Sequence, residues 1–229
     1  MKADANLATL PVEGAEFVVP ETVSIPAGQF KAAAAGGAPR SVEIAGFRIG
    51  RTPVTNHEYA AFVAAGRAAP PPWWIDPDFS RPQQPVVGIT WDEAMAYCGW
   101  LGERTGELCR LPTEAEWEFA IGGGLIAPRT AWGETIPSGE IPEGPLHGPW
   151  EVGRGKPNGF GLCDAGTIVH EWCANWHEPE GRRAGLARRA SRGGSWRHEI
   201  RWSSPSAVSS LPPGYRYSDY GFRVLVEVE

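Results

Sequence analysis

The stretch RLPTEAEWEFAIGGG, residues 110–124, contains the signals that begin and end an α-helix. Thr113 is followed three positions later by Glu116, which is a capping-box pattern: the hydroxyl accepts from an early helix amide and the glutamate reaches back to the cap. The glycine run at residues 122–124 supplies a stop, because glycine readily adopts the left-handed conformation at which many helices end. The stretch therefore predicts a short helix that begins after Thr113 and ends at the glycines.

Two further capping boxes lie upstream of this helix. The sequence TNHE at residues 55–58 predicts a helix over residues 56–65, with Gly66 as its stop. The sequence TWDE at residues 90–93 predicts a second helix that ends near Gly106. Three helices are thus expected in the first half of the chain.

The remaining segments favour strands and loops. Residues 21–30 and 41–51 alternate apolar and polar positions around turn-forming proline and glycine, and they predict an antiparallel strand pair. Residues 69–85 are too rich in proline for regular structure and predict a long loop. Beyond residue 132 there is little helical periodicity, and residues 222–228 alternate as a strand would. The pattern indicates an α+β fold with much of its backbone in loops.

Composition places the chain among folded globular proteins. It has 229 residues, of which 42% are hydrophobic and 21% charged, and its 29 glycines and 22 prolines are spread along the whole length. This length buries a substantial core, and no linker divides the chain. We expect one domain over residues 1–229.

Charge and hydropathy argue against two classes of partner. The formal net charge is −6, and no extended block of lysine or arginine is present, so general nucleic-acid binding is not expected. No apolar run is long enough to cross a bilayer, and the first residues contain no signal-peptide pattern, so no membrane partner is expected. We expect a soluble, cytoplasmic protein. In that compartment the cysteines Cys98, Cys109, Cys163 and Cys173 are interpreted as small buried thiols.

Eight stretches resemble one family in order and register. They are IPAGQF (25–30), GRTPVTNHEYAAFV (50–63), PVVGITWDEAMAYCGWL (85–101), RLPTEAEWEFA (110–120), AWGE (131–134), NGFGLCDAGTIVHEWCANW (158–176), RGGSW (192–196) and GFRV (221–224). The chain resembles the formylglycine-generating enzyme superfamily over residues 21–228. That superfamily also includes the C-terminal domain of the ergothioneine sulfoxide synthases and PvdO-like proteins. The resemblance implies a distorted C-type-lectin-like α+β fold with little regular secondary structure.

The resemblance also implies where a catalytic cysteine pair would stand. In formylglycine-generating enzymes, two cysteines shortly after the RGGS-type motif bind copper(I) and the substrate thiol, and a target cysteine is oxidised with dioxygen. An ungapped alignment places His198 and Ser203 at those positions, and no cysteine of this chain lies beyond Cys173. We therefore expect neither copper at a cysteine site nor formylglycine generation by the usual mechanism.

A calcium loop is a further implication of the resemblance. Asp164 and Glu171 match the side-chain ligands of the family's structural calcium, and Thr167 and Val169 match its backbone carbonyl ligands. Calcium requires several hard oxygens, which a loop of this kind can supply. Thr167 departs from the family's glycine. Two interpretations stay open, a calcium site and an empty loop held by hydrogen bonds.

Histidines raise the question of a different metal. His170 replaces the tryptophan usual in the calcium-loop motif, and His198 occupies a cysteine position. A lone histidine is usually a structural or surface residue, but His170, His198 and His177 together would suit iron, copper or zinc if the fold brought them together. The iron-binding helical bundle of the ergothioneine enzymes has no counterpart in this sequence, although a partner protein could supply what is missing.

A candidate binding groove follows the RGGSW motif. Residues 196–220 mix aromatic side chains with arginine and serine, a composition typical of binding surfaces, and the family's substrate groove runs along the equivalent stretch. The residues expected to line a pocket for a small molecule or a peptide are Trp73, Trp74, Arg197, His198, Arg201, Trp202, Tyr215 and Tyr217. Three functions stay open: a ligand-binding module, a histidine-based oxidative metalloenzyme, and an accessory subunit of another enzyme.

Overall fold

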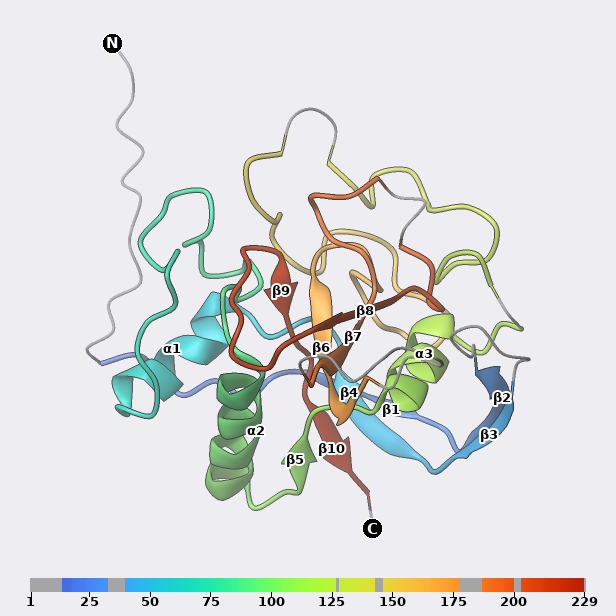
Figure 1. Ribbon diagram of the computed structural model, residues 1–229, viewed down its shortest axis with the longest axis horizontal. Helices are drawn as coiled ribbons and strands as arrows, with labels where there is room; N and C mark the ends of the chain where they lie inside the picture. Colours follow the sequence, from blue (N-terminus) through green and yellow to red (C-terminus); the bar gives the residue numbers. More distant parts are fainter. Residues whose placement is uncertain are drawn as a thin grey trace.

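The computed structural model describes residues 14–32, 40–126, 128–142, 146–177, 187–199 and 203–228. Its helices are α1 (Asn56–Ala64), α2 (Trp91–Thr105) and α3 (Glu114–Gly122). The strands are β1 (Thr22–Ile25), β2 (Gly28–Ala32), β3 (Arg40–Ile44), β4 (Phe47–Gly50), β5 (Cys109–Arg110), β6 (His170–Trp176), β7 (Arg189–Arg192), β8 (Val208–Leu211), β9 (Tyr220–Gly221) and β10 (Leu225–Glu227). The α+β class and the scarcity of regular structure are confirmed (Figure 1).

All three predicted helices are confirmed, and so are their capping boxes. In each helix the N-cap threonine accepts from the backbone of the third helical residue, and the glutamate at that position accepts from the cap. Gly106 ends α2 and Gly123 ends α3 in left-handed conformations, with φ of 77° and 62°. Helix α1 ends at Ala64, and its C-cap is Ala65, one residue before the predicted stop at Gly66.

The strands form two four-stranded sheets and one hairpin. The first sheet has the order β1-β4-β10-β5, the second has the order β8-β7-β6-β9, and β2 pairs with β3. Every pairing is antiparallel except that of β6 with β9. The parallel pair brings residue 170 beside residue 220, which is the arrangement on which the candidate site is built.

The predicted strand pair is divided between two layers. Residues 22–25 pair with residues 47–50 in the first sheet, whereas residues 28–32 pair with residues 40–44 as a separate hairpin. Pro26 lies between the two upstream strands, where its missing amide interrupts a ladder. Strands β6 to β9 were not predicted, because each is short and lies among loop residues. The predicted C-terminal strand is confirmed only over β10.

The core lies between the helices and the sheets. Helices α1 and α2 pack on each other, and α2 packs on β5; α3 packs on the β2–β3 hairpin and on β6 and β7 (Figure 1). Trp117 of α3 and Trp172 of β6 are the largest fully buried side chains. No helix within the described ranges is both long and apolar enough to span a bilayer.

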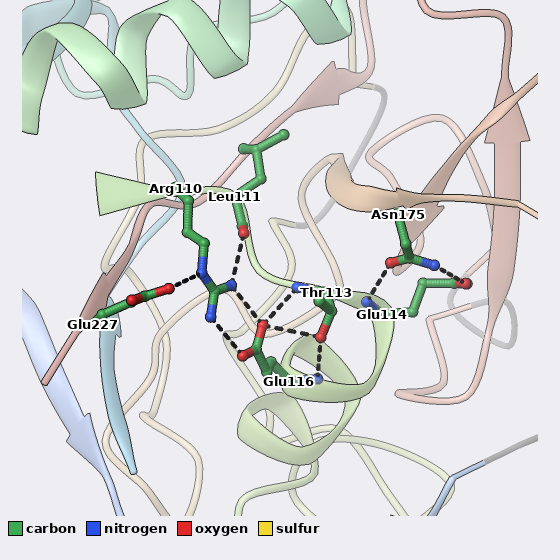
Figure 2. A network of polar contacts seen from close by, with 7 residues as sticks. All are labelled: Arg110, Leu111, Thr113, Glu114, Glu116, Asn175 and Glu227. Carbon is green, nitrogen blue, oxygen red and sulfur yellow. Dashed lines mark hydrogen bonds and ion pairs between the residues drawn. The ribbon is translucent and has the colours of Figure 1, made fainter. Parts of the chain in front are cut away.

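The N-terminal end of α3 connects the two four-stranded sheets (Figure 2). Arg110 of β5 donates two 2.8 Å hydrogen bonds to the carboxylate of Glu116, and its Nε donates to Glu227 of β10 at 2.6 Å. The backbone amide of Glu114 donates to the side-chain oxygen of Asn175 on β6 at 2.9 Å. The end of α3 thus contacts β6 directly and β5 through Arg110, which itself contacts β10, and this network links the two sheets.

Candidate functional site

An open pocket lies where the second sheet meets the loops that precede β8 and β9. Its volume is about 350 Å³. The lining residues come from the start of β6, the loop after β7, strand β8 and the loop into β9: His170, Arg197, His198, Ser209, Leu211, Tyr217, Asp219 and Tyr220. Polar, aromatic and charged side chains thus converge on one small cavity, the usual character of a ligand site.

Parallel pairing of β6 with β9 positions His170. The backbone amide of His170 donates to the carbonyl oxygen of Asp219 at 2.8 Å, and its ring lies 4.9 Å, centroid to centroid, from that of Tyr220. The Tyr220 hydroxyl lies 2.8 Å from the Ser209 hydroxyl, and the Ser191 hydroxyl donates to it over 3.4 Å. The backbone of His170 is therefore fixed by its hydrogen bond to Asp219, and its imidazole packs against the ring of Tyr220.

The tautomer of His170 follows from its hydrogen bond. Its Nδ1 lies 2.7 Å from the carbonyl oxygen of Gly193, which only accepts, so Nδ1 carries the proton and Nε2 keeps a free lone pair. Burial lowers the pKa of His170 and favours the neutral ring. A neutral imidazole with a free Nε2 is the form that binds metals.

His198 and Asp219 complete a cluster with His170. The two imidazole rings lie 5.1 Å apart, and Nε2 of His198 is 3.6 Å from a carboxylate oxygen of Asp219. The buried Asp219 carboxylate also accepts a 2.8 Å hydrogen bond from the Ser195 hydroxyl. One nitrogen or oxygen atom from each of His170, His198 and Asp219 lies within 4.8 Å of the others.

The alternative that three histidines meet at one site is thus correct for two of them. His170 and His198 meet, whereas His177 lies beyond the end of β6, donates its backbone amide to Arg188, and takes no part in the cluster. Within the described ranges, the cluster of His170, His198 and Asp219 is the one group of three or more such side chains spaced to hold a metal ion.

Only some of the residues predicted to line a groove lie at the pocket. Arg197, His198 and Tyr217 line the pocket. Tyr215 is exposed but lies outside the lining. Arg201 and Trp202 lie outside the described residues.

The prediction that Trp73 and Trp74 wall the groove is wrong. Trp74 is only 6% exposed and packs in the main core, 6.4 Å from Tyr59 between ring centroids. Trp73 packs against Phe79, and a methyl group at Gly88 would lie 2.6 Å from its ring. The proline-rich loop packs both rings against apolar neighbours and leaves Trp74 buried and Trp73 half-buried, because the burial of large apolar surface is favourable.

None of the four cysteines lines the pocket. Cys98, Cys163 and Cys173 are buried and Cys109 is half-buried on β5, which bears out the structural interpretation for three of the four. Burial raises the pKa of all four thiols. Such thiols are poor nucleophiles and poor ligands at neutral pH. Ser203, at the second cysteine position, is buried against Gly194 and lies outside the lining.

The predicted calcium loop is held by hydrogen bonds. The carboxylate of Asp164 accepts from the backbone amide of Gly153 at 2.6 Å and from the indole of Trp150 at 3.4 Å. The carboxylate of Glu171 accepts from the indole of Trp117 at 2.7 Å and from Arg223 at 3.0 Å. Each acidic side chain therefore has its own donors.

Arg223 pairs with the Glu171 carboxylate and also reaches the backbone of Asp164. Its side chain is fully buried, and it also donates to the backbone carbonyls of Cys163 and Asp164, at 2.7 and 3.1 Å. A guanidinium supplies the positive charge that a calcium ion would supply, and a calcium cage needs those oxygens unprotonated and unshared. The carboxylates of Asp164 and Glu171 are thus hydrogen-bonded within the protein, and calcium at Asp164, Thr167, Val169 and Glu171 stays a prediction.

Sequence reasoning missed Asp219, Ser209, Leu211 and Tyr220 as pocket residues. Asp219 and Tyr220 directly precede the GFRV motif, so proximity to a matched motif was the available signal. Their contact with His170 depends on the parallel pairing of β9 with β6, which links residues about fifty positions apart. No local pattern reports such a pairing.

Comparison with known proteins agrees with the fold. The family model for the sulfatase-modifying factor enzyme 1-like domain matches residues 8–228. The formylglycine-generating enzyme of Streptomyces coelicolor is 32% identical over 254 residues, covering 80% of this chain and 79% of that protein. The formylglycine-generating enzyme of Thermomonospora curvata is 30% identical over 267 residues, covering 82% of this chain and 86% of that protein.

Structural similarity extends over the same length. The structure of PvdO from Pseudomonas aeruginosa aligns with a TM-score of 0.75 at 25% identity, covering 91% of this chain and 95% of that one. The domain match spans almost the whole sequence, and two enzymes at 30% identity or more align with most of it. The chain belongs to the formylglycine-generating enzyme family, the family of sulfatase-modifying factors.

Proposed function

We propose that this chain is a diverged member of its family that binds a small molecule or a peptide side chain in the pocket around Arg197, His198 and Tyr217. The observation that carries the proposal is the place of the pocket. It contains His198, which aligns with the first catalytic cysteine of the family, and its lining includes no thiol. A ligand site thus persists where the cysteine chemistry is missing.

The absence of cysteine oxidation is part of this proposal. Thiolates are the soft ligands and nucleophiles that the family's copper chemistry requires. The four thiols of this chain lie outside the pocket, and their pKa values are raised. We expect no conversion of cysteine to formylglycine when a cysteine-containing peptide is incubated with the protein, copper(I) and dioxygen, as followed by peptide mass spectrometry.

The chemistry of the lining favours a small anionic ligand with an apolar or aromatic body. Arg197 contributes an exposed guanidinium, whereas Tyr217 and Leu211 contribute apolar surface. A guanidinium recognises carboxylates and other oxyanions in a two-point geometry. A cavity of about 350 Å³ lies at the small end of ligand sites, which suits a compact molecule or one peptide side chain.

Ligand-observed NMR with two probes of equal size tests this binding. Benzoate and benzylamine share an aromatic ring but differ in the sign of their charge. We expect benzoate to bind the metal-free protein and benzylamine to bind at least tenfold more weakly. Arg197→Ala is expected to abolish the preference, and Arg154→Ala, which removes an exposed arginine outside the pocket, to leave it unchanged. Equal binding of benzoate to wild type and Arg197→Ala would refute the proposal.

A metal-dependent oxidative enzyme is the second candidate. The observation that favours it is the 5.1 Å contact between the rings of His170 and His198, next to a buried carboxylate. Iron or another transition metal bound there would supply redox chemistry, and the chain's own residues would orient the substrate. Dioxygen consumption by iron-loaded protein, compared with His198→Ala, tests this candidate.

A further inference from the structure

Three side chains in the pocket offer a nitrogen, nitrogen and oxygen donor set. Their ligand atoms lie within 4.8 Å of one another. Ligands bound to a first-row metal at roughly 2.0–2.2 Å lie about 3 to 3.5 Å from each other. The ligand atoms therefore need to approach one another by only a small distance. The His198 side chain is 46% exposed, so it can rotate to make this approach.

His170 is already oriented as a ligand. Nδ1 donates its proton to the Gly193 carbonyl oxygen over an N···O distance of 2.7 Å, which leaves Nε2 as the coordinating atom. A backbone carbonyl or carboxylate on the far nitrogen is the usual support of a metal-binding histidine, because it sets the tautomer and the ring orientation. Packing on Tyr220 at 4.9 Å fixes the ring plane.

Asp219 is supported in the same way. Its carboxylate accepts from the Ser195 hydroxyl at 2.8 Å, and its own backbone carbonyl accepts from the amide of His170. Ser195 is 2% exposed and Asp219 is 4% exposed. A buried carboxylate that accepts from one hydroxyl and faces two imidazoles attracts a cation, because burial of its charge is costly without a partner.

We infer that His170, His198 and Asp219 form a binding site for one divalent first-row transition metal. Two imidazoles with one carboxylate suit iron(II), cobalt(II) or zinc(II), whereas calcium and magnesium prefer oxygen ligands alone and copper(I) prefers thiolates. The inference goes beyond the binding of an organic ligand and does not depend on it.

The site is of the open kind. Three protein ligands approach from β6, from the loop after β7 and from the loop before β9, and the fourth side faces the pocket that Arg197 and Tyr217 line. Closed structural sites use four protein ligands, whereas three ligands and an open position are typical of sites that bind a further molecule at the metal. An anionic molecule beside Arg197 is placed to occupy that position.

Titration of the full chain with zinc(II) and cobalt(II) tests the inference. The protein is stripped with chelator, reloaded, dialysed and analysed by mass spectrometry for metal per chain, and cobalt(II) absorption is followed in the visible range. We expect one equivalent and a cobalt spectrum typical of nitrogen and oxygen ligands. His198→Ala is expected to weaken zinc affinity by more than the roughly 10- to 100-fold loss that follows removal of an outer-sphere partner.

Controls separate a metal site from a general effect of histidine or of folding. His177→Ala removes a histidine near the end of the same strand but outside the cluster, and it is expected to keep one equivalent. Ser195→Ala is expected to bind more weakly than wild type but more tightly than His198→Ala. Substoichiometric metal in the wild type, or one equivalent retained by a folded His198→Ala, would overturn the inference. Benzoate binding to metal-free protein bears only on the ligand proposal.

Discussion

Glu171 and Arg223 form an ion pair that is completely buried. Both side chains are 0% exposed, and Nε of Arg223 lies 3.0 Å from each oxygen of the Glu171 carboxylate. The pair joins the start of β6 to the segment between β9 and β10. A buried charge without its partner is costly, because the low dielectric of the interior does not replace the lost hydration.

Removal of either partner is expected to destabilise the fold strongly. Arg223→Met leaves the buried Glu171 carboxylate without its cation and removes the donor to four backbone carbonyls, and the free energy of unfolding should fall by about 3–5 kcal/mol. Urea denaturation followed by tryptophan fluorescence measures this. Arg51→Met, which breaks an exposed pair with Glu21, should cost less than about 1 kcal/mol. Similar losses in both variants would contradict the argument.

Calcium is expected to leave the stability unchanged. Arg223 already supplies the positive charge beside Asp164 and Glu171, so an added ion finds no set of free oxygens there. Thermal unfolding of chelator-treated protein should give the same Tm with and without millimolar calcium. A rise of Tm with calcium that is lost in Asp164→Asn would show that the loop rearranges around an ion.

Glu140 is expected to make stability fall as pH rises. It is 1% exposed, and burial together with the neighbouring Asp164 raises its pKa to about 7, from 4.5 in the unfolded chain. Between these two values the folded state holds a proton that the unfolded state releases, so the free energy of unfolding decreases with pH and levels off above about 7. Glu140→Gln should remove this part of the pH dependence and stabilise the protein by roughly 1–3 kcal/mol at pH 8.

The measurement is a set of urea titrations between pH 4 and pH 8. Asp164→Asn should lower the pKa of Glu140 by removing the neighbouring negative charge, and the decline should then occur at lower pH. An identical pH profile for wild type and Glu140→Gln would exclude Glu140 as its source.

Gly193→Ala tests the support of His170. Gly193 has φ of 82°, and an added methyl carbon would lie 3.0 Å from Gly166 and 3.2 Å from the ring of Trp117. Backbone strain and steric overlap together should lower the free energy of unfolding by roughly 1–3 kcal/mol. The displaced carbonyl should also weaken metal binding at His170.

Gly66→Ala is the matched control for this variant. Gly66 also has a positive φ, 68°, but nothing lies within 4 Å of an added methyl group. It should lose stability from backbone strain alone and keep full metal affinity. Metal titration of both variants at a temperature where each is folded makes the comparison, and equal affinities in the two would argue against the role of the Gly193 carbonyl.

Local features of the chain were predictable from sequence. The capping boxes at Thr55, Thr90 and Thr113 act between residues three positions apart, so the helices could be placed almost to the residue. Arg197, His198 and Tyr217 could be assigned to the pocket because all three follow the RGGSW motif. The pairing of β1 with β4 and of β2 with β3 could not be predicted, because it depends on which other strand each of them meets.

Burial was the less predictable property. Trp73 and Trp74 belong to a loop without periodicity, and nothing in their neighbourhood indicates that the loop folds back on the core. Arg223 belongs to the matched GFRV motif, but its pairing with Glu171 required the fold. A side chain's exposure depends on what packs against it, and that information lies elsewhere in the chain.

The sequence by itself determined the family and the three helices, because both rest on residue identity at fixed local spacing. Only the tertiary structure decided that His170 and His198 meet, that Asp219 joins them and that Arg223 pairs with Glu171. The parallel contact of β6 with β9 brings residues about fifty positions apart within hydrogen-bonding distance. Such contacts arise from packing of the whole chain, and no local segment encodes them.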